Sequence, residues 1–362
     1  MRGAARALAS ASALAIDTES NNFFRYHIRT SLVQIADPDG RIFLIDPLTL
    51  GDLSPLGPLL ADPRIRKVFH DAGNDIGDLK RDFAFSFAGI RDTRVAAQFC
   101  GRPRLGLDEL LRSELGIEHP KPRRFQRCDW SRRPLTPAQE RYAAGDVAHL
   151  LALWDRLADE LRRRGREAWA IEESEGLAES GPSELRSATD FMRIRGAHAL
   201  APDQKAVLRE LVRLREHLAR RNDQSPLMIA GDAGLIALAR EQPRDAETLG
   251  RIRGLSPRFR ERHAQDVLDA IRRGLESTEN LPPPRRPQLP REQAARIGRL
   301  KSWRASAARE TGLEPGLVLP QRLIETMAAD PPRNLAELGA HPGIRRWRVE
   351  VFGPGILAAL RA

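Results

Sequence analysis

The sequence is first informative for what it has little of. Its 362 residues contain two cysteines, Cys100 and Cys128, which supply neither a disulfide framework nor a cysteine-ligated zinc site. Aromatic residues make up 5% of the chain, and no ladder of aromatic side chains that would stack a single nucleic-acid strand is visible. No apolar run approaches the ~20 residues that a membrane span requires. These absences predict a chain with no membrane partner, located in a reducing cytoplasm.

The charge of the chain is unevenly distributed. Hydrophobic residues make up 41% and charged residues 30%, which is typical of folded proteins, and the length suits two or three domains. Residues 1–190 contain 28 basic and 29 acidic side chains, whereas residues 191–362 contain 31 and 20. The C-terminal half therefore carries the excess positive charge, which favours a polyanionic partner. A generally arginine-rich proteome is the alternative explanation.

Strand and helix signals alternate over the first half of the chain. Short apolar runs predict strands at residues 13–16, 31–36, 42–45 and 65–69. A turn at residues 37–40 joins the second run to the third, and a lead-in shorter than usual precedes the first. Helical periodicity is seen up to residue 83, at residues 107–115 and from 137 to about 164. Thr136, Pro137 and Gln139 form the start of that last helix. This order predicts a mixed α/β sheet.

Beyond residue 180 the sequence predicts helices alone. They are expected at residues 204–221, 233–240, 246–252 and 260–275. A proline-rich stretch follows and predicts a stiff linker at residues 278–289. The helical pattern then partly repeats, which predicts a duplicated small helical domain. The expected domains are residues 1–190, 195–277 and 290–362.

Four carboxylates and one tyrosine are the candidate site: Asp17, Glu19, Asp75, Tyr142 and Asp146. Asp17 and Glu19 are two apart and share a face if the first strand continues through them. Tyr142 and Asp146 are four apart on a helix and also share a face. Carboxylates without His or Cys favour Mg²⁺ or Mn²⁺, and two such ions ~4 Å apart can clamp a phosphodiester. Each fragment alone is commonly a surface or capping feature, but together they predict a two-metal phosphodiesterase.

These fragments resemble the ribonuclease D family of 3′–5′ exonucleases over residues 15 to about 157. The matching stretches are residues 17–23, 32–36, 67–76, 129–136 and 142–147. The most specific is Asp-Trp-Ser-Arg-Arg-Pro-Leu-Thr at 129–136, because nothing in metal chemistry requires it. The later helical segments resemble HRDC (helicase and RNase D C-terminal) domains. The resemblance implies an RNase-H-like α/β exonuclease domain followed by two all-α HRDC domains.

The resemblance also implies a role for each site residue. Asp17, Glu19 and Asp146 would hold the metal ion that activates water, and Asp17 would be shared with a second ion. Asp75 would support that second ion. Tyr142 would orient the attacking water, because a phenol with a pKa of ~10 is a poor base at pH 7.

Residues that contact nucleic acid are expected in two places. Arg123 and Gln126 precede the Asp-Trp pair, where nuclear-exosome relatives have Lys-x-x-Gln, and arginine changes the geometry of that contact. Arg251, Arg253 and Arg258 lie in a basic turn of the C-terminal half. Such a turn is often only solvated, but the surrounding positive charge favours phosphate contact.

These expectations combine into one function with two alternatives. The chain is expected to be a metal-dependent 3′–5′ exoribonuclease that trims structured RNA, such as precursor tRNA, and releases 5′-mononucleotides. A 3′–5′ DNA exonuclease is the first alternative, since no residue that reads the 2′-OH is identified. The second is a nucleic-acid-binding scaffold with a vestigial site.

Overall fold

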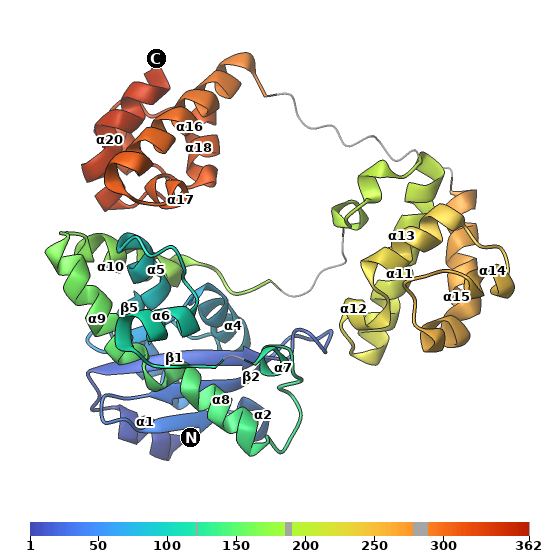
Figure 1. Ribbon diagram of the computed structural model, residues 1–362, viewed down its shortest axis with the longest axis horizontal. Coiled ribbons are helices and arrows are strands. Elements are labelled where there is room, and N and C mark those ends of the chain that lie inside the picture. Colours follow the sequence, from blue (N-terminus) through green and yellow to red (C-terminus); the bar gives the residue numbers. More distant parts are fainter. Residues whose placement is uncertain (121, 185–189, 278–288, 362) are drawn as a thin grey trace.

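The structure is a computed structural model that describes residues 1–120, 122–184, 190–277 and 289–361. A sheet domain (residues 1–179) is followed by a first helical domain (residues 202–276) and a second helical domain (residues 291–361), as Figure 1 shows. The expected fold class, an α/β domain followed by two all-α domains, is confirmed. Except for its last residue, the linker predicted at 278–289 lies outside the described residues. Over the described ranges, each helix is too short or too polar to cross a membrane.

The sheet has five strands in the order β3-β2-β1-β4-β5. They are β1 (Ala13–Ser20), β2 (Thr30–Ala36), β3 (Ile42–Ile45), β4 (Arg66–Phe69) and β5 (Ile90–Asp92). β1 is central, because it pairs antiparallel with β2 and parallel with β4. The predicted turn between β2 and β3 is present, with Gly40 at φ 78° donating its N–H to the carbonyl of Asp37. β5 was not predicted, because three residues are too few to show a periodicity.

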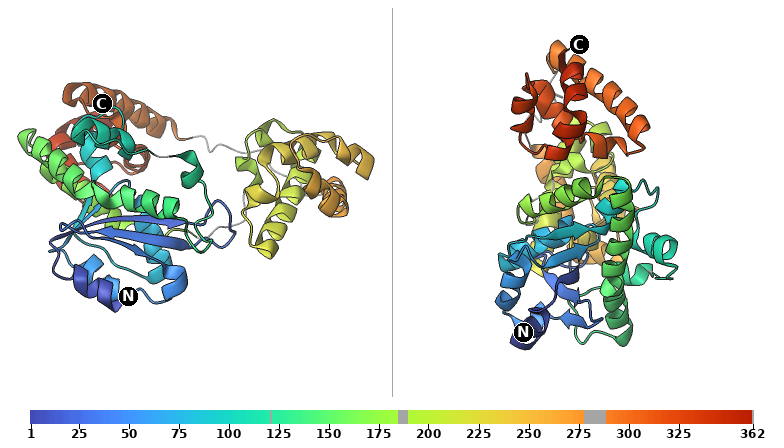
Figure 2. Two further views of the ribbon diagram at one scale, coloured as in Figure 1. Left: turned by 60° about the horizontal axis from the view of Figure 1, so that its bottom comes forward. Right: turned by 90° about the vertical axis from the view of Figure 1, so that its left-hand side faces the viewer.

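Helices cover both faces of the sheet (Figure 2). Leu14 and Ile16 of β1 pack on the face covered by α1 (Arg2–Leu8), α3 (Gly57–Ala61) and α4 (Gly73–Phe83). Ala15 points to the opposite face, where α5 (Thr93–Phe99), α6 (Leu107–Leu115) and α9 (Leu150–Arg163) lie. Helix α1 occupies what the sequence indicated only as a lead-in. The alternation along β1 therefore decides which helices each of its side chains meets.

The single helix predicted from residue 137 to about 164 is two helices. α8 (Pro137–Ala148) ends at His149, whose φ of −121° and ψ of 4° interrupt the helix before α9 begins. The predicted capping box at the start of α8 is confirmed, with Thr136 and Gln139 bonding to each other's backbone N–H. α8 crosses β1, β2 and β3, whereas α9 packs against α5 and α6. Because of this break, α8 can lie across the sheet while α9 packs against α5 and α6.

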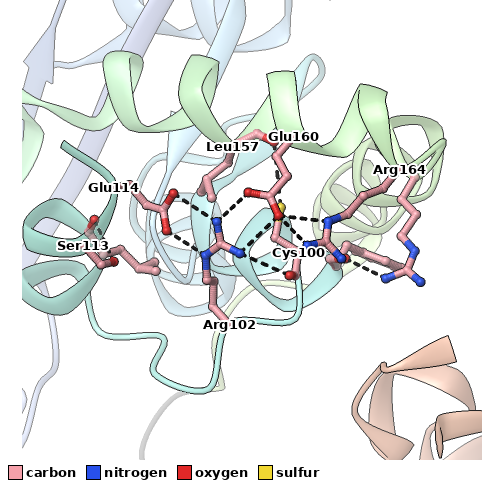
Figure 3. Close-up of polar contacts among 10 residues, drawn as sticks. Cys100, Arg102, Ser113, Glu114, Leu157, Glu160 and Arg164 are labelled. Carbon is pink, nitrogen blue, oxygen red and sulfur yellow. Dashed lines mark hydrogen bonds and ion pairs between the residues drawn. The ribbon is translucent and has the colours of Figure 1, made fainter.

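One arginine forms ion pairs with two helices on the face of the sheet that α9 covers. Arg102, which follows α5, donates from Nε to Glu114 of α6 at 2.6 Å. Its Nη2 donates to Glu160 of α9 at 2.5 Å, and Arg164 also binds Glu160 (Figure 3). Both carboxylates are largely buried, so this charge cluster is satisfied within the layer.

The helical domains repeat one five-helix pattern. The first contains α11 (Pro202–Asn222), α12 (Pro226–Ile229), α13 (Asp232–Glu241), α14 (Ala246–Gly250) and α15 (Pro257–Glu276). The second contains α16 (Arg291–Thr311), α17 (Pro315–Val318), α18 (Gln321–Ala329), α19 (Leu335–Gly339) and α20 (Arg346–Arg361). Asp245 caps α14 and Asn334 caps the equivalent α19, each accepting the N–H three residues on. The predicted duplication is therefore present in the structure.

The second helical domain shares its core with the sheet domain. Trp347 of α20 stacks on Trp169 of α10 (Glu167–Gly176), with ring centroids 5.1 Å apart, and meets Phe99 edge-on at 5.2 Å. Its indole N–H donates to Glu173 at 2.8 Å, and its backbone N–H donates to Glu172 at 3.0 Å. Apolar residues of both domains form one continuous cluster. These contacts between α10 and α20 are called the α10–α20 interface below.

The first helical domain has a core of its own and meets the sheet domain through polar contacts. Tyr26, in the connection between β1 and β2, donates its hydroxyl hydrogen to Glu216 of α11 and accepts from Arg220 at 3.0 Å. The backbone N–H of His27 donates to Asp223 at 3.0 Å. These contacts between the β1–β2 connection and α11 are called the junction below.

Candidate active site

Three of the predicted carboxylates lie together at the end of the central strand. Asp17 and Glu19 extend from β1, and Asp146 extends from α8, which crosses the same face of the sheet. Each offers an oxygen, and these three oxygens lie within 4.8 Å of one another. β1 continues through Asp17 and Glu19, which is the condition under which the sequence placed them on one face.

Tyr142 lies one turn before Asp146 on α8 and is held by aromatic side chains. Its ring centroid is 5.4 Å from that of Phe125 and 6.0 Å from that of Trp130. Trp130 is buried and donates its indole N–H to the carbonyl of Phe125 at 3.2 Å. The Asp-Trp-Ser segment, which metal chemistry does not explain, thus forms one wall against the tyrosine ring.

The environment of Tyr142 keeps its phenol protonated. Burial raises the pKa of Tyr142 well above its usual value, and the negative charges of Asp146, Glu19 and Asp17 raise it further. The hydroxyl group is therefore a hydrogen-bond donor at neutral pH and not a base.

Asp75 lies apart from the cluster of three carboxylates. It is in the first turn of α4, where its Oδ1 accepts a hydrogen bond of 2.5 Å from the hydroxyl of Thr18. Thr18 stands between Asp17 and Glu19 and points to the opposite face of β1. Burial raises the pKa of Asp75 to about 7, and the hydrogen bond from Thr18 acts against that increase. A bound cation would favour the ionised form of this carboxylate.

The structure adds two residues that the sequence did not indicate. His119, in the loop after α6, lies with Nε2 3.0 Å from Oδ1 of Asp146. A β-carbon at Gly145 would be 2.9 Å from the imidazole of His119, so glycine at this position makes room for the ring. Gln34 of β2 lies directly opposite Asp17 and is fully buried. Only the glycine within Tyr-Ala-Ala-Gly-Asp gave an indirect signal of such a close approach.

The residues predicted to contact nucleic acid belong to α7 (Arg123–Gln126) and to the region where α14 leads into α15, and the carboxylate cluster belongs to β1 and α8. Gln126 is exposed on α7, and the side chain of Arg123 lies outside the described part of the structure. Arg251 and Arg253 are exposed in the turn between α14 and α15, and Arg258 is exposed at the start of α15. Figures 1 and 2 place that turn on the side of the first helical domain away from the sheet.

The donor atoms of the cluster fit a divalent cation. All three side chains offer carboxylate oxygens, which are the ligands that hard cations such as Mg²⁺ and Mn²⁺ prefer. Three like charges this close repel one another unless a cation or protons neutralise them. The residues therefore suit a divalent-metal centre.

The fold and the carboxylate centre define a 3′–5′ exonuclease that carries two further helical modules. A family model described as 3′–5′ exonuclease matches residues 1–162, and a model of the HRDC domain matches residues 204–271 and 293–360.

Relatives that match nearly the whole chain show which family of 3′–5′ exonucleases it belongs to. Ribonuclease D of Gluconacetobacter diazotrophicus is 32% identical over 350 residues, which cover 95% of this chain and 86% of the relative. This chain belongs to the ribonuclease D family and is a 3′–5′ exoribonuclease.

Two solved structures have the same arrangement of domains. A protein from Bifidobacterium adolescentis is 25% identical with a TM-score of 0.78, and the match covers 100% of this chain and 95% of that one. The RNase D of Escherichia coli is 24% identical with a TM-score of 0.68, and the match covers 99% and 96% of the two chains. The second likeness concerns the fold alone.

Proposed function

We propose that this exoribonuclease hydrolyses the 3′-terminal phosphodiester with two divalent cations, Mg²⁺ or Mn²⁺, held by Asp17, Glu19, Asp146 and Asp75. The observation that carries this proposal is the convergence of three carboxylate oxygens within 4.8 Å, with Tyr142 one turn from Asp146 on α8. When bound, the cations supply a polarised water and neutralise charge on the phosphate and on the departing oxygen.

The protein side chains divide the remaining work. Asp17, Glu19 and Asp146 fix the position of the phosphodiester relative to the water, and Asp75 completes the set from the opposite face of β1. Tyr142 keeps its proton on Oη and orients the attacking water by a hydrogen bond. Trp130 and Phe125 support that orientation, because they pack against the phenol ring.

The site acts on a chain end because of what surrounds it. Phe23, which follows Glu19 by four positions, is 49% exposed, and the guanidinium of Arg127 lies 6.0 Å from its ring. An exposed aromatic ring beside a cation suits stacking of the terminal base. Attack on the phosphate from the side opposite the 3′ oxygen then releases a 5′-mononucleotide.

The substrate we favour is the 3′ end of structured RNA such as precursor tRNA, in the cytoplasm. The positive balance of residues 191–362 supports a polyanion held outside the cleavage site. The basic α14–α15 turn corresponds by position to the α19–α20 turn, whose Arg345 binds Glu179 of the sheet domain. In the first copy, Arg251 pairs with Glu247 at 2.5 Å. Exposed Arg253 and Arg258 beside it are our candidates for phosphate contact, together with Arg251. The two cysteines are free, which supports a reducing compartment.

The test of the site is the loss of turnover without the loss of binding. We expect Asp17→Ala and Asp146→Ala each to lower hydrolysis at least 100-fold, because each removes a carboxylate oxygen from the cation. RNA affinity in EDTA should stay within about threefold of the wild type, since the basic half is untouched. Asp159→Ala, which removes an exposed carboxylate on α9, is the matched control and should retain full activity. Retention of a tenth of wild-type turnover in both site variants would contradict the assignment.

The direction and the substrate class need a second measurement. A 5′-labelled RNA should yield a descending ladder with Mg²⁺ or Mn²⁺, and a circular RNA of the same sequence should remain intact. A matched DNA oligonucleotide tests the alternative activity. Equal or faster degradation of the DNA would make the chain a general 3′–5′ exonuclease, and internal cuts in the circle would exclude exonuclease action.

A further inference from the structure

A cavity of about 850 Å³ lies where the first helical domain meets the sheet domain. Its walls come from the β1–β2 connection, from α2 (Pro47–Leu50), from the end of α4 and from α11. Figures 1 and 2 show the β1–β2 connection reaching toward the first helical domain at this place. The cavity therefore belongs to neither domain alone, and the junction forms part of its wall.

The charge that lines the cavity is mainly positive. Arg29 of the sheet domain and Arg220 of α11 are exposed on walls that belong to different domains. A third guanidinium, of Arg81, is paired with Asp82 at 2.7 Å. Asp82 is the one carboxylate among the residues that line the cavity, and it also accepts from the backbone and hydroxyl of Thr30. Arg29 thus faces the cavity without a further acidic residue among the lining residues to pair with, and Arg220 donates only to a neutral tyrosine hydroxyl on the cavity wall. Guanidinium groups suit phosphate oxygens.

Part of the cavity wall is apolar. Leu48 is 41% exposed, and Phe83 is partly exposed beside it in the same cavity. The Arg220 guanidinium lies 5.4 Å from the ring centroid of Tyr26, so its planar face is already oriented by an aromatic side chain. Cationic groups beside an apolar wall suit the sugar and base of a nucleotide as well as its phosphate.

The cavity lies close to the strand that carries the catalytic carboxylates. Arg29 is paired with Asn21, which accepts the Arg29 N–H on its side-chain oxygen at 2.8 Å and donates its own N–H to the Arg29 carbonyl at 3.3 Å. Asn21 follows Glu19 by two positions. Thr30, on the cavity wall, pairs with Ser20 in the sheet. The end of α4 lines the cavity, so the cavity lies toward the face of β1 opposite to the carboxylate cluster. An RNA strand that leaves the carboxylates in the 5′ direction therefore reaches Arg29 by passing the end of β1 at Asn21.

We propose that this cavity is a subsite for the sugar–phosphate backbone of the RNA substrate, a few nucleotides upstream of the 3′ end that is cut. The proposal rests on the proposed function, because it takes the carboxylate cluster as the position of the terminal nucleotide. Arg29 contacts the phosphate from the sheet domain, and Arg220 contacts it from the first helical domain.

Occupation of this subsite couples RNA binding to domain docking. The strand bridges the two domains, so RNA stabilises the junction, and an intact junction raises the affinity for RNA by the same factor. A dinucleotide is too short to span the carboxylates and the cavity, and its hydrolysis gains nothing from either arginine.

The experiment measures RNA binding by the full chain in EDTA, where no turnover is needed. Arg29→Gln should lower the affinity for a labelled octanucleotide several-fold and reduce the slope of log K against log salt by about 1. Arg29→Lys keeps the charge and should restore the slope. Arg220→Gln should act in the same direction. Arg64→Gln, which removes an 87% exposed arginine in the loop before β4, is the matched control and should leave both quantities unchanged.

Turnover with Mg²⁺ separates this subsite from the catalytic centre. The kcat/KM for a dinucleotide should be unchanged in Arg29→Gln, whereas the KM for the octanucleotide should rise. An unchanged salt slope in Arg29→Gln, or an equal loss with both substrates, would overturn the proposal. Failure of the wild type to shorten RNA with either metal would overturn the proposed function instead, while the slope measured in EDTA would still test the subsite.

Discussion

The two helical domains have the same five helices, yet they are attached to the sheet domain in different ways. The second shares an apolar cluster with it, centred on Trp347, Trp169 and Phe99. The first keeps a separate core and is attached at the junction by hydrogen bonds to Tyr26 and His27. Burial of large aromatic side chains contributes several kcal/mol. At the junction the Tyr26–Glu216 hydrogen bond is buried, whereas the His27–Asp223 contact is exposed and contributes little.

The two helical domains are therefore held to the sheet domain with different strengths. Arg348 illustrates the first case, because it is 3% exposed and pairs with Glu173 at 2.5 Å within the α10–α20 interface. Separation there would leave a buried charge unpaired, which is strongly unfavourable. At the junction, Asp223 and His27 are largely exposed and can exchange their contact for water. We therefore expect the first helical domain to detach from the sheet domain at a lower free-energy cost than the second.

The largest effect is expected from Trp347→Ala. The change removes a buried indole, its contacts with Trp169 and Phe99 and its hydrogen bond to Glu173, at a cost of about 3–5 kcal/mol. Calorimetric unfolding should show a clearly lower transition temperature. Val351→Ala on the same helix, where the side chain is 38% exposed, should change stability by less than about 0.5 kcal/mol. Equal transition temperatures for the two variants would remove the distinction between the domains.

An intermediate effect is expected from Tyr26→Phe. The ring is kept, but the hydroxyl that links Glu216 and Arg220 is lost, which should cost about 1 kcal/mol. Because the first helical domain has its own core, the melting temperature should change little. The distance distribution between spin labels on the two domains should broaden. A distribution as narrow as that of the wild type would show that the junction hydroxyl does not control docking.

The smallest effect on the junction is expected from lowering the pH. Burial works against the ionisation of Asp223, but hydrogen bonds from the N–H and ring of His27 hold its pKa below the ordinary value. A carboxyl with a lowered pKa stabilises the docked form above pH ~4 and loses that contribution as the pH falls through the folded pKa. Since Asp223 is 45% exposed, solvent screening limits the contribution to less than about 0.5 kcal/mol. The distance distribution between spin labels on the two domains should therefore broaden slightly as the pH falls below ~4. Asp223→Asn should abolish this dependence on pH.

Much of the fold could be predicted because local signals agree with the tertiary structure. The Thr136–Gln139 capping box, the turn at Gly40 and the duplicated helical pattern all depend on neighbouring residues, and each is present. The break at His149 could not be predicted, because it carries neither proline nor glycine. It arises where α8 follows the sheet and α9 follows α5 and α6. Such a break is a tertiary effect.

Part of the candidate site could likewise be predicted from the sequence, and part of it could not. Asp17 with Glu19, and Tyr142 with Asp146, could be grouped because strand and helix periodicities fix which side chains share a face. The position of His119 depends on a loop that packs against Gly145 across 26 residues, and no periodicity encodes that. The hydrogen bond from Thr18 to Asp75 joins β1 to α4 across 57 residues of sequence and likewise has no local signal.

The separation of the carboxylates along the chain has a consequence for synthesis on the ribosome. Asp17 and Glu19 are made early, but the third oxygen of the cluster belongs to Asp146 of α8. A nascent chain that ends before α8 therefore lacks a complete centre, even if its first strands have already paired. The enzyme gains its complete carboxylate centre only after α8 has emerged. A nuclease that is translated beside ribosomal and transfer RNA is in this way inactive while the first strands of its own sheet are being made.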